Sequence, residues 1–284
     1  LSMKIHSKIL KISALCAAAA IISNSAMIIS AADTADANIT ARQETAAHTE
    51  TAAYNWYCKH TADHSQPPLD SLLSFTKGYS AYYADTKHAS WDDKEKVIYL
   101  TFDAGYENGN VEKILDVMKE KEVSGAFFIL ENLTRRNADL VRRMQDEGHL
   151  VCNHTASHKD MSGVCDKEAF LAELKALEDD CKAIGVSCAK FYRPPEGRFS
   201  EQNLKFAAEA GYCTVFWSFA YVDWDNNSQM SRDAAIKKVL DGTHNGEVIL
   251  LHPTSSTNAA ILGELIDAWR DMGFTFGTLN ELCK

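Results

Sequence analysis

Short apolar stretches alternate with amphipathic stretches from about residue 95 to the C-terminus. The apolar stretches are rich in β-branched and aromatic residues, which is typical of buried strands; they lie at 97–102, 126–130, 150–152, 191–192, 214–217, 248–251 and 274–276. Between them, apolar residues recur every three or four positions, as on one face of a helix. The expected helices span 110–121, 167–184, 201–210 and 258–270, with a further helix around 140–144 that Gly148 ends.

Repeated strand–helix units predict a parallel sheet, and strands that are apolar throughout are expected to be covered on both faces. With about seven such units, a closed or nearly closed β/α barrel fits the pattern better than an open sheet, although the number of strands alone does not separate the two. The chain has 284 residues, which is long enough to bury one large core. We therefore expect one catalytic domain.

The N-terminal region has a different pattern. Three lysines among the first eleven residues precede an apolar stretch over 12–29, and small residues follow it. This order predicts a secretory signal over 1–32. An uncleaved membrane anchor is the competing interpretation, because the polar residues at 23–25 interrupt the stretch without shortening it decisively. Residues 33–53 are rich in Ala, Thr and Glu, which predicts a flexible tether.

The overall charge excludes one class of partner. The formal net charge is −10, and the lysines and arginines are dispersed along the sequence. Binding to a phosphate backbone requires a basic surface. We therefore expect no nucleic-acid partner.

The cysteines give no clear disulfide framework. The chain has eight cysteines, and Cys16 lies in the N-terminal apolar stretch. The other seven are an odd number with irregular spacing. Cys152 and Cys213 lie in strand-like stretches and Cys181 lies on the apolar face of a helix. We expect these three to act as small buried apolar side chains. A single bridge between Cys181 and Cys188 is the alternative.

Polar residues that suit hydrolysis follow five of the predicted strands. In parallel β/α barrels the active site lies at the carboxyl ends of the strands, and the residues at these positions are Asp103, His154 with His158, Arg193, Asp223 with Trp224, and His252. Two imidazoles at the end of one strand can bind one divalent ion. Each residue alone also fits a helix cap, a rigid corner or a loop, but five strand ends together predict a hydrolytic site.

The longer sequence motifs around these residues resemble those of a known family. The segments are Leu100–Gly109, Asn153–His158, Arg193–Pro195, Val215–Ala220, Asp223–Trp224 and His252. In order and spacing they resemble the polysaccharide deacetylases, carbohydrate esterase family 4, also called the NodB homology domain. The resemblance implies a distorted (β/α)7-8 barrel over 96–284. Residues 54–95 resemble the extension that precedes and packs on the barrel in the branch that makes muramic δ-lactam in spore peptidoglycan.

The resemblance also assigns acid–base roles that amide hydrolysis requires. Asp103 matches the catalytic base that deprotonates water, and Arg193 matches the residue that keeps this base ionised, since a nearby opposite charge lowers a carboxylate pKa. His252 matches the general acid for the leaving amine. Asp223 matches the carboxylate that pairs with His252 and favours the imidazolium.

The remaining roles concern the metal and the sugar. His154 and His158 match metal ligands, with zinc favoured and cobalt or manganese as alternatives. The backbone N–H near Glu196 is expected to help bind the oxyanion. Trp217 and Trp224 are expected to line the sugar site, with core packing as the structural alternative for both.

One position departs from the family pattern. The first motif usually carries a second carboxylate that completes the metal triad, and Ala104 stands in its place. Catalytic zinc sites generally have three protein ligands and water. The metal is therefore expected to be weakly bound with additional waters or substrate, or to be held by Glu107 or Asn108 instead. The third alternative is a protein that works without a tight metal or is inactive. Glu196 is also unusual, because positive or aromatic residues are more common there.

These observations define three functional hypotheses. The resemblance implies a secreted or membrane-anchored deacetylase of N-acetylmuramic acid, acting as a monomer on the peptidoglycan glycan strand in the cell wall or spore cortex. Membrane contact would come only from an uncleaved N-terminal segment. The second hypothesis is deacetylation of another sugar, such as peptidoglycan N-acetylglucosamine or chitin oligomers. The third is a non-catalytic glycan-binding protein, motivated by Ala104.

Overall fold

The computed structural model describes residues 49–284, of which Glu50–Lys284 form one compact unit. The predicted signal or anchor over 1–32, and all but the end of the predicted tether over 33–53, lie outside the described residues. Within the described part, no helix is long and apolar enough to cross a membrane.

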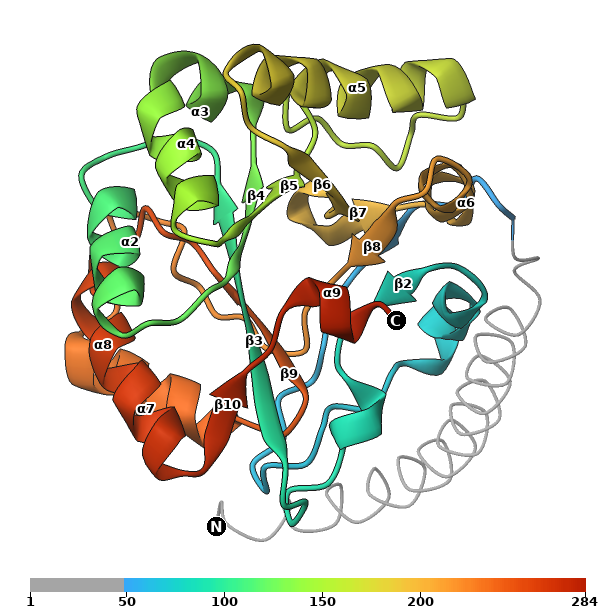
Figure 1. Cartoon of the computed structure of the whole chain (residues 1–284). Helices are drawn as coiled ribbons and strands as arrows, with labels where there is room; N and C mark the ends of the chain where they lie inside the picture. Colours follow the sequence, from blue (N-terminus) through green and yellow to red (C-terminus); the bar gives the residue numbers. More distant parts are fainter. Residues whose placement is uncertain (1–48) are drawn as a thin grey trace, which may run out of the picture. The chain divides into compact units, whose positions relative to one another are not determined.

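The centre of the fold is a curled sheet in which every neighbouring pair of strands is parallel (Figure 1). Its strands are β2 (Ala81–Tyr82), β3 (Lys96–Ala104), β4 (Ala126–Ile129), β5 (Leu150–Asn153), β6 (Cys188–Tyr192), β8 (Cys213–Val215), β9 (Glu247–Leu251) and β10 (Phe274–Phe276). β9 and β4 flank β3, and the order continues through β5, β6 and β8 to β2. β10 pairs with the first residues of β3.

The sheet closes incompletely. After β8 the chain leaves the sheet, and a single parallel bridge between Phe219 and Ile249 connects this segment to β9. The result is an incomplete barrel, which confirms the predicted distorted β/α barrel. The strand predicted over 214–217 is shorter, because Phe216 and Trp217 leave the sheet before the bridge forms.

Helices lie around the outside of the strands (Figure 1). They are α2 (Val111–Glu120), α3 (Glu131–Arg136), α4 (Ala138–Asp146), α5 (Lys167–Ala183), α6 (Glu201–Glu209), α7 (Arg232–Gly242), α8 (Ser256–Asp271) and α9 (Leu279–Leu282). The five helices expected from periodicity are present at the predicted positions. Three of these helices were not predicted. α3 and α9 are too short to show a helical period, with six and four residues. The buried residues of α7 include the small Ala235 and Gly242 beside Val239 and so give a weak apolar pattern.

The segment before the barrel contributes to the same unit. β1 (Tyr54–Asn55) pairs antiparallel with β7 (Arg198–Phe199), and β2 extends the barrel sheet beside β8. Three 3-10 helices complete the described elements: η1 (Ser71–Gly78), η2 (Thr86–His88) and η3 (Pro195–Gly197). The ring of Trp56 stacks on Phe216 with ring centroids 4.2 Å apart. Residues 54–95 therefore pack directly against the segments that follow the carboxyl ends of β6 and β8.

The structure corrects the interpretation of Cys213. Its sulfur is bonded to Cys283 across 70 residues of sequence, so the bridge ties β8 to the C-terminus after α9. The sequence could not indicate this pairing, because Cys283 has no regular spacing to any other cysteine. Cys152 and Cys181 are buried free thiols, as predicted, and Cys188 is a half-buried free thiol.

A buried histidine predicts how stability depends on pH. His149 is 5% exposed, its Nδ1 accepts a hydrogen bond of 3.2 Å from the Gly125 N–H, and its Nε2 has no partner among the described residues. Burial lowers its pKa from 6.5 to about 4. The unfolded chain therefore binds a proton at higher pH than the folded chain. The stabilisation by neutral His149 is complete above pH 6.5 and is lost as the pH falls toward 4.

We expect protonation of His149 to lower the free energy of unfolding by about 3 kcal/mol as the pH falls toward 4, since one pKa unit corresponds to about 1.4 kcal/mol. Urea unfolding at several pH values between 7.5 and 4 measures it in the parent and in His149→Asn, which retains an acceptor for the Gly125 N–H. The free energy of unfolding should fall less steeply with acid in the variant. Two parallel curves would contradict the assignment to His149.

Candidate active site

A cavity of about 760 Å³ opens at the carboxyl ends of the strands and collects most of the predicted site. Seven of the nine predicted residues line it: Asp103, His154, His158, Glu196, Trp217, Trp224 and His252. The other two, Arg193 and Asp223, are buried beneath the lining and contact it from behind. The residues predicted from five strand ends are therefore brought together in one place.

Asp103 and Arg193 form a buried ion pair. Arg193 follows β6 directly and is fully buried, and its Nη1 donates to Asp103 Oδ1 at 2.8 Å. Burial alone would raise the pKa of the Asp103 carboxyl, but His154, Arg193 and His252 together hold that pKa below its usual value. Asp103 is therefore an ionised carboxylate whose second oxygen remains available at the cavity.

Arg193 is held rigidly by four acceptors. Besides Asp103, it donates to Thr101 Oγ1 at 2.9 Å, to the Val215 carbonyl at 2.9 Å and to the Phe216 carbonyl at 3.2 Å. The guanidinium also lies 4.2 Å from the centre of the Phe128 ring. The arginine is thus fixed by three neighbouring segments, and its ion-pair partner is Asp103.

His154 and His158 lie next to each other after β5. Their ring centroids are 5.0 Å apart. The Nδ1 of His154 donates to the Arg193 carbonyl at 2.9 Å, so Nε2 is the nitrogen that faces Asp103 Oδ2, at 3.5 Å. Burial lowers the pKa of His154 to about 4, although the Asp103 charge acts in the opposite direction. A neutral imidazole with a free Nε2 is the form that binds metal.

The loop that carries both histidines is fixed by Asn153, the last residue of β5. Its Nδ2 donates to the Leu174 carbonyl at 2.8 Å and to the Tyr212 hydroxyl at 3.2 Å, and its Oδ1 accepts from the Thr155 N–H at 2.9 Å. Thr155 and His158 adopt left-handed backbone angles, with φ of 71° and 58°. These contacts hold a strained turn that directs the two rings to the same side.

The side chains do not complete a ligand set for a catalytic metal. Within residues 49–284, no three His, Cys, Asp or Glu side chains are arranged to hold one ion. Ala104 is buried in the apolar core and offers no donor. Glu107 accepts a hydrogen bond from the Gly109 N–H, Asn108 donates to the Thr254 carbonyl, and neither lines the cavity. A catalytic zinc needs three protein ligands, and two imidazoles leave this set incomplete.

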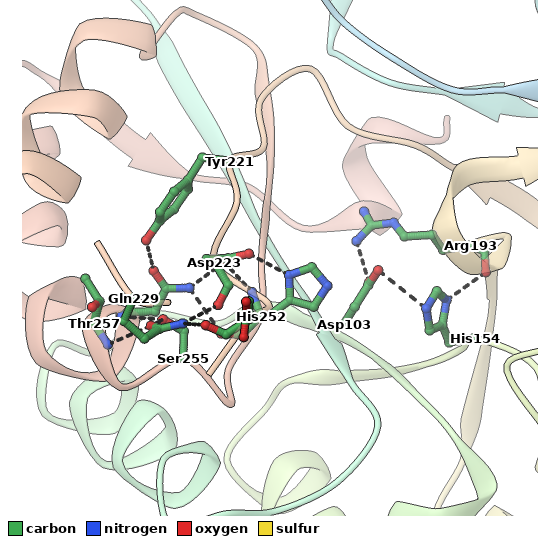
Figure 2. Close-up of polar contacts among 11 residues, drawn as sticks. Asp103, His154, Arg193, Tyr221, Asp223, Gln229, His252, Ser255 and Thr257 are labelled. Atoms are coloured by element: carbon green, nitrogen blue, oxygen red, sulfur yellow. Dashed lines mark hydrogen bonds and ion pairs between the residues drawn. The ribbon is translucent and has the colours of Figure 1, made fainter. Parts of the chain in front are cut away.

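His252 and Asp223 form the second charged pair. His252 follows β9 and faces the cavity, while Asp223 is 2% exposed behind it. His252 Nδ1 donates to Asp223 Oδ1 at 2.7 Å, which leaves Nε2 free for a group in the cavity. Burial would lower the pKa of His252, but the hydrogen bond and charge of Asp223, with the charge of Asp103, raise it above its usual value. Figure 2 shows this pair next to Asp103, Arg193 and His154.

Glu196 and the two tryptophans form the wall and rim. Glu196 has a φ of 56°, and its exposed side chain lines the cavity. Gly197 follows with a φ of 67°, and a Cβ there would lie 2.8 Å from the ring of Trp217. Trp217 both lines the cavity and packs on the cluster around Trp56, whereas Trp224 is 59% exposed. Core packing therefore explains part of the placement of the Trp217 side chain, and it does not explain the placement of Trp224.

Several cavity residues were not predicted from the sequence. They are Gly105, Tyr106, Leu130, Ala220, Tyr221, Leu250 and Thr254. Tyr106 is 44% exposed and its hydroxyl accepts a hydrogen bond of 2.6 Å from Asn226. The one available signal was its position three residues after Asp103, on the loop that leaves β3.

An incomplete β/α barrel with a carboxylate–arginine pair and a histidine–carboxylate pair around one cavity is the arrangement of a hydrolytic enzyme. Residues 91–215 match the polysaccharide deacetylase family. The chain is 37% identical over 230 residues to the peptidoglycan-N-acetylmuramic acid deacetylase PdaA of Bacillus subtilis (strain 168), covering 80% of this chain and 85% of that protein.

A solved structure of the same relative and one further relative agree with this match. The structure of Bacillus subtilis PdaA, a family 4 carbohydrate esterase, superimposes with a TM-score of 0.76 at 36% identity, over 82% of this chain and 97% of that chain. A peptidoglycan-N-acetylglucosamine deacetylase of Bacillus cereus is 32% identical over 189 residues, 65% of this chain and 67% of that protein. The chain belongs to the polysaccharide deacetylases of carbohydrate esterase family 4, hydrolases that act on amide bonds. The resemblance identified from the motifs is confirmed.

Proposed function

We propose that the protein is an exported de-N-acetylase of peptidoglycan N-acetylmuramic acid, which hydrolyses the acetamide to an amine and acetate as a step toward muramic δ-lactam in the spore cortex. The observation that carries the chemistry is the placement of the Asp103–Arg193 and His252–Asp223 pairs around one cavity. The 37% identity to a relative with the N-acetylmuramic acid activity supports the substrate. The glycan strand is the partner, and the protein acts as a monomer.

Asp103 is the base in this proposal. Its Oδ1 is occupied by Arg193, so Oδ2 takes the proton from a water molecule that attacks the acetamide carbon. A carboxylate whose pKa is lowered stays ionised over the working pH range, which keeps the proton-accepting form available. The new carbon–oxygen bond produces a tetrahedral intermediate with a charged oxygen. The backbone N–H near Glu196 is proposed to donate to that oxygen.

His252 is the acid. Its Nδ1 is hydrogen-bonded to Asp223, and the raised pKa of the ring keeps a proton on Nε2 to higher pH than in a free imidazole. Transfer of that proton to the sugar nitrogen allows the carbon–nitrogen bond to break, which releases the amine and acetate. Trp217 and Trp224 are proposed to contact the sugar ring from the wall and the rim of the cavity.

Deacetylases of this family are in general metal-dependent, yet His154 and His158 form an incomplete ligand set here. We propose that a divalent metal, zinc before cobalt or manganese, binds weakly to the two imidazoles. Elemental analysis after gel filtration is expected to show substoichiometric metal, and His154→Ala should abolish the residual binding. Activity should fall after chelator and return with added zinc, cobalt or manganese. A stoichiometric metal that survives dialysis would contradict weak binding.

Mass spectrometry of purified glycan fragments tests the function. The parent is expected to remove one acetyl group from peptide-free N-acetylmuramic acid in a glycan strand, with each of the three metals supplied in turn. The double variant Asp103→Asn with His252→Ala should remove none. Failure of the parent to release acetate from any muramic acid substrate, under all metal conditions, would overturn the proposal.

A second candidate substrate is N-acetylglucosamine. Among the described residues that line the cavity there is no lysine or arginine, and Glu196 adds a carboxylate at the rim. A neutral sugar is easier to accommodate there than one that bears a free lactyl carboxylate. The relative from Bacillus cereus carries the N-acetylglucosamine activity in its name. Comparing acetate release from the two sugars in the same glycan strand separates the candidates.

A further inference from the structure

The Asp223 carboxylate is held by three hydrogen bonds, one of which comes from outside the pair. His252 donates to it through Nδ1 at 2.7 Å and through its backbone N–H at 2.8 Å. The third donor is Asn258 Nδ2, which lies 2.6 Å from Asp223 Oδ2. Asn258 is 1% exposed and does not line the cavity. It therefore acts on Asp223 from behind and cannot contact the sugar.

The orientation of the Asn258 amide is fixed. Its Nδ2 donates to the His252 carbonyl at 3.1 Å as well as to Asp223, while its Oδ1 accepts from the Tyr221 hydroxyl. A flipped amide would place its oxygen against a carboxylate oxygen and a carbonyl oxygen and would lose both donors. The Tyr221 hydroxyl can satisfy the amide oxygen only in the observed orientation. Asn258 consequently holds both members of the pair at once.

Asn258 lies in the first turn of α8, and the N-terminal end of this helix also holds the backbone of Asp223 through Gln229 (Figure 2). Gln229 Nε2 donates to the Asp223 carbonyl at 2.9 Å, and Gln229 Oε1 accepts from the Ser255 hydroxyl. Ser255 is the N-cap of α8 and accepts from the Asn258 N–H at 3.1 Å. The loop that carries Asp223 and the first turn of α8 are thus joined by side chains that all lie outside the cavity lining.

We propose that Asn258, oriented by Tyr221, is a positioning residue for the Asp223–His252 pair. The inference rests on the proposed function, in which His252 is the acid. The ionisable groups that face His252 are Asp223, Asp103 and Arg193, and substitution of Asn258 leaves all three in place. Without the amide, Asp223 loses one of its three donors and can turn away from Nδ1. The imidazolium is then less stabilised, and its proton is lost at lower pH.

The pH dependence of kcat tests this role in Asn258→Leu and Tyr221→Phe. In Asn258→Leu, the basic limb of the kcat–pH profile should move to lower pH by about half a unit or more. The kcat should fall roughly tenfold, and KM should be nearly unchanged. Tyr221→Phe should shift the limb in the same direction by a smaller amount. Asn203→Leu is the matched control, because Asn203 occupies the same third position in α6 behind a serine N-cap, is also buried, and does not line the cavity.

The control should lose stability without any shift of the basic limb. If Asn258→Leu and Tyr221→Phe keep the parent's basic limb and differ only in unfolding temperature, the positioning role is wrong. Should Asn258→Leu fail to fold, Tyr221→Phe decides alone. NMR titration of the His252 ring, identified by its absence in His252→Ala, gives the same comparison without turnover. An inactive parent would therefore overturn the proposed function while the positioning role is still decided by the titration.

Discussion

Substitution of Asp103 by Asn is expected to reduce kcat for deacetylation by on the order of 10³, within the range that a positioned base contributes. The amide of asparagine cannot accept the proton of the attacking water. It can still accept the hydrogen bond from Arg193 Nη1, which is 2.8 Å from Asp103 Oδ1 in the parent. The variant therefore removes the proton-accepting function and keeps most of the local geometry, so KM should change little.

The same variant should also lose stability, because the Arg193 charge then has no charged partner in a fully buried position. We expect a decrease of about 3 kcal/mol in the free energy of unfolding, at the low end for a broken buried pair. Thr101, Val215 and Phe216 still accept from the guanidinium and limit the loss. Urea unfolding and steady-state kinetics measure the two effects separately.

Asp85→Asn is the matched control for this experiment. Asp85 is 6% exposed, accepts a hydrogen bond of 2.7 Å from the Tyr99 hydroxyl, and lies outside the cavity. Its substitution should reduce stability and leave kcat unchanged. If Asp103→Asn retains more than a tenth of the parent's kcat while folded, Asp103 is not the base.

The sequence predicted the site best where a polar residue stands at the end of a buried strand. Asp103, Arg193 and His252 each stand at or immediately after a buried apolar stretch, so their strand fixes their position to within one residue. In a parallel barrel those ends converge, and the prediction needed no knowledge of side-chain contacts. The cavity confirms that the side chains converge, and their catalytic roles remain proposals.

The sequence was uninformative where position depends on contacts between distant segments. Asn258 lies in the first turn of a helix, where a buried asparagine is ordinarily a capping residue. Only the fold shows that its amide reaches Asp223, 35 residues away in sequence. The Cys213–Cys283 bridge was missed for the same reason, since 70 residues separate its ends. Ala104 is the opposite case, because the absence of a donor is evident from the residue type alone.

Substitution of His252 by Ala should affect substrates according to their leaving group. An amine leaves a tetrahedral intermediate only when its nitrogen is protonated, so loss of the acid should reduce kcat for the N-acetylated sugar by on the order of 10² to 10³. An aryl acetate releases a stable aryloxide that needs no proton. On such an ester, the same variant should retain activity to within about tenfold.

Asp103→Asn supplies the comparison that separates acid from base. Water must be deprotonated for attack on either substrate, so that variant should lose activity on the sugar and on the ester alike. The parent should also lose activity on the sugar as the pH rises through the raised pKa of His252, because the imidazolium is the donor. That basic limb should be absent from His252→Ala and from the parent's reaction with the ester. Equal losses on both substrates in His252→Ala would show that His252 supports binding or attack, and that the proton for the leaving amine comes from another group.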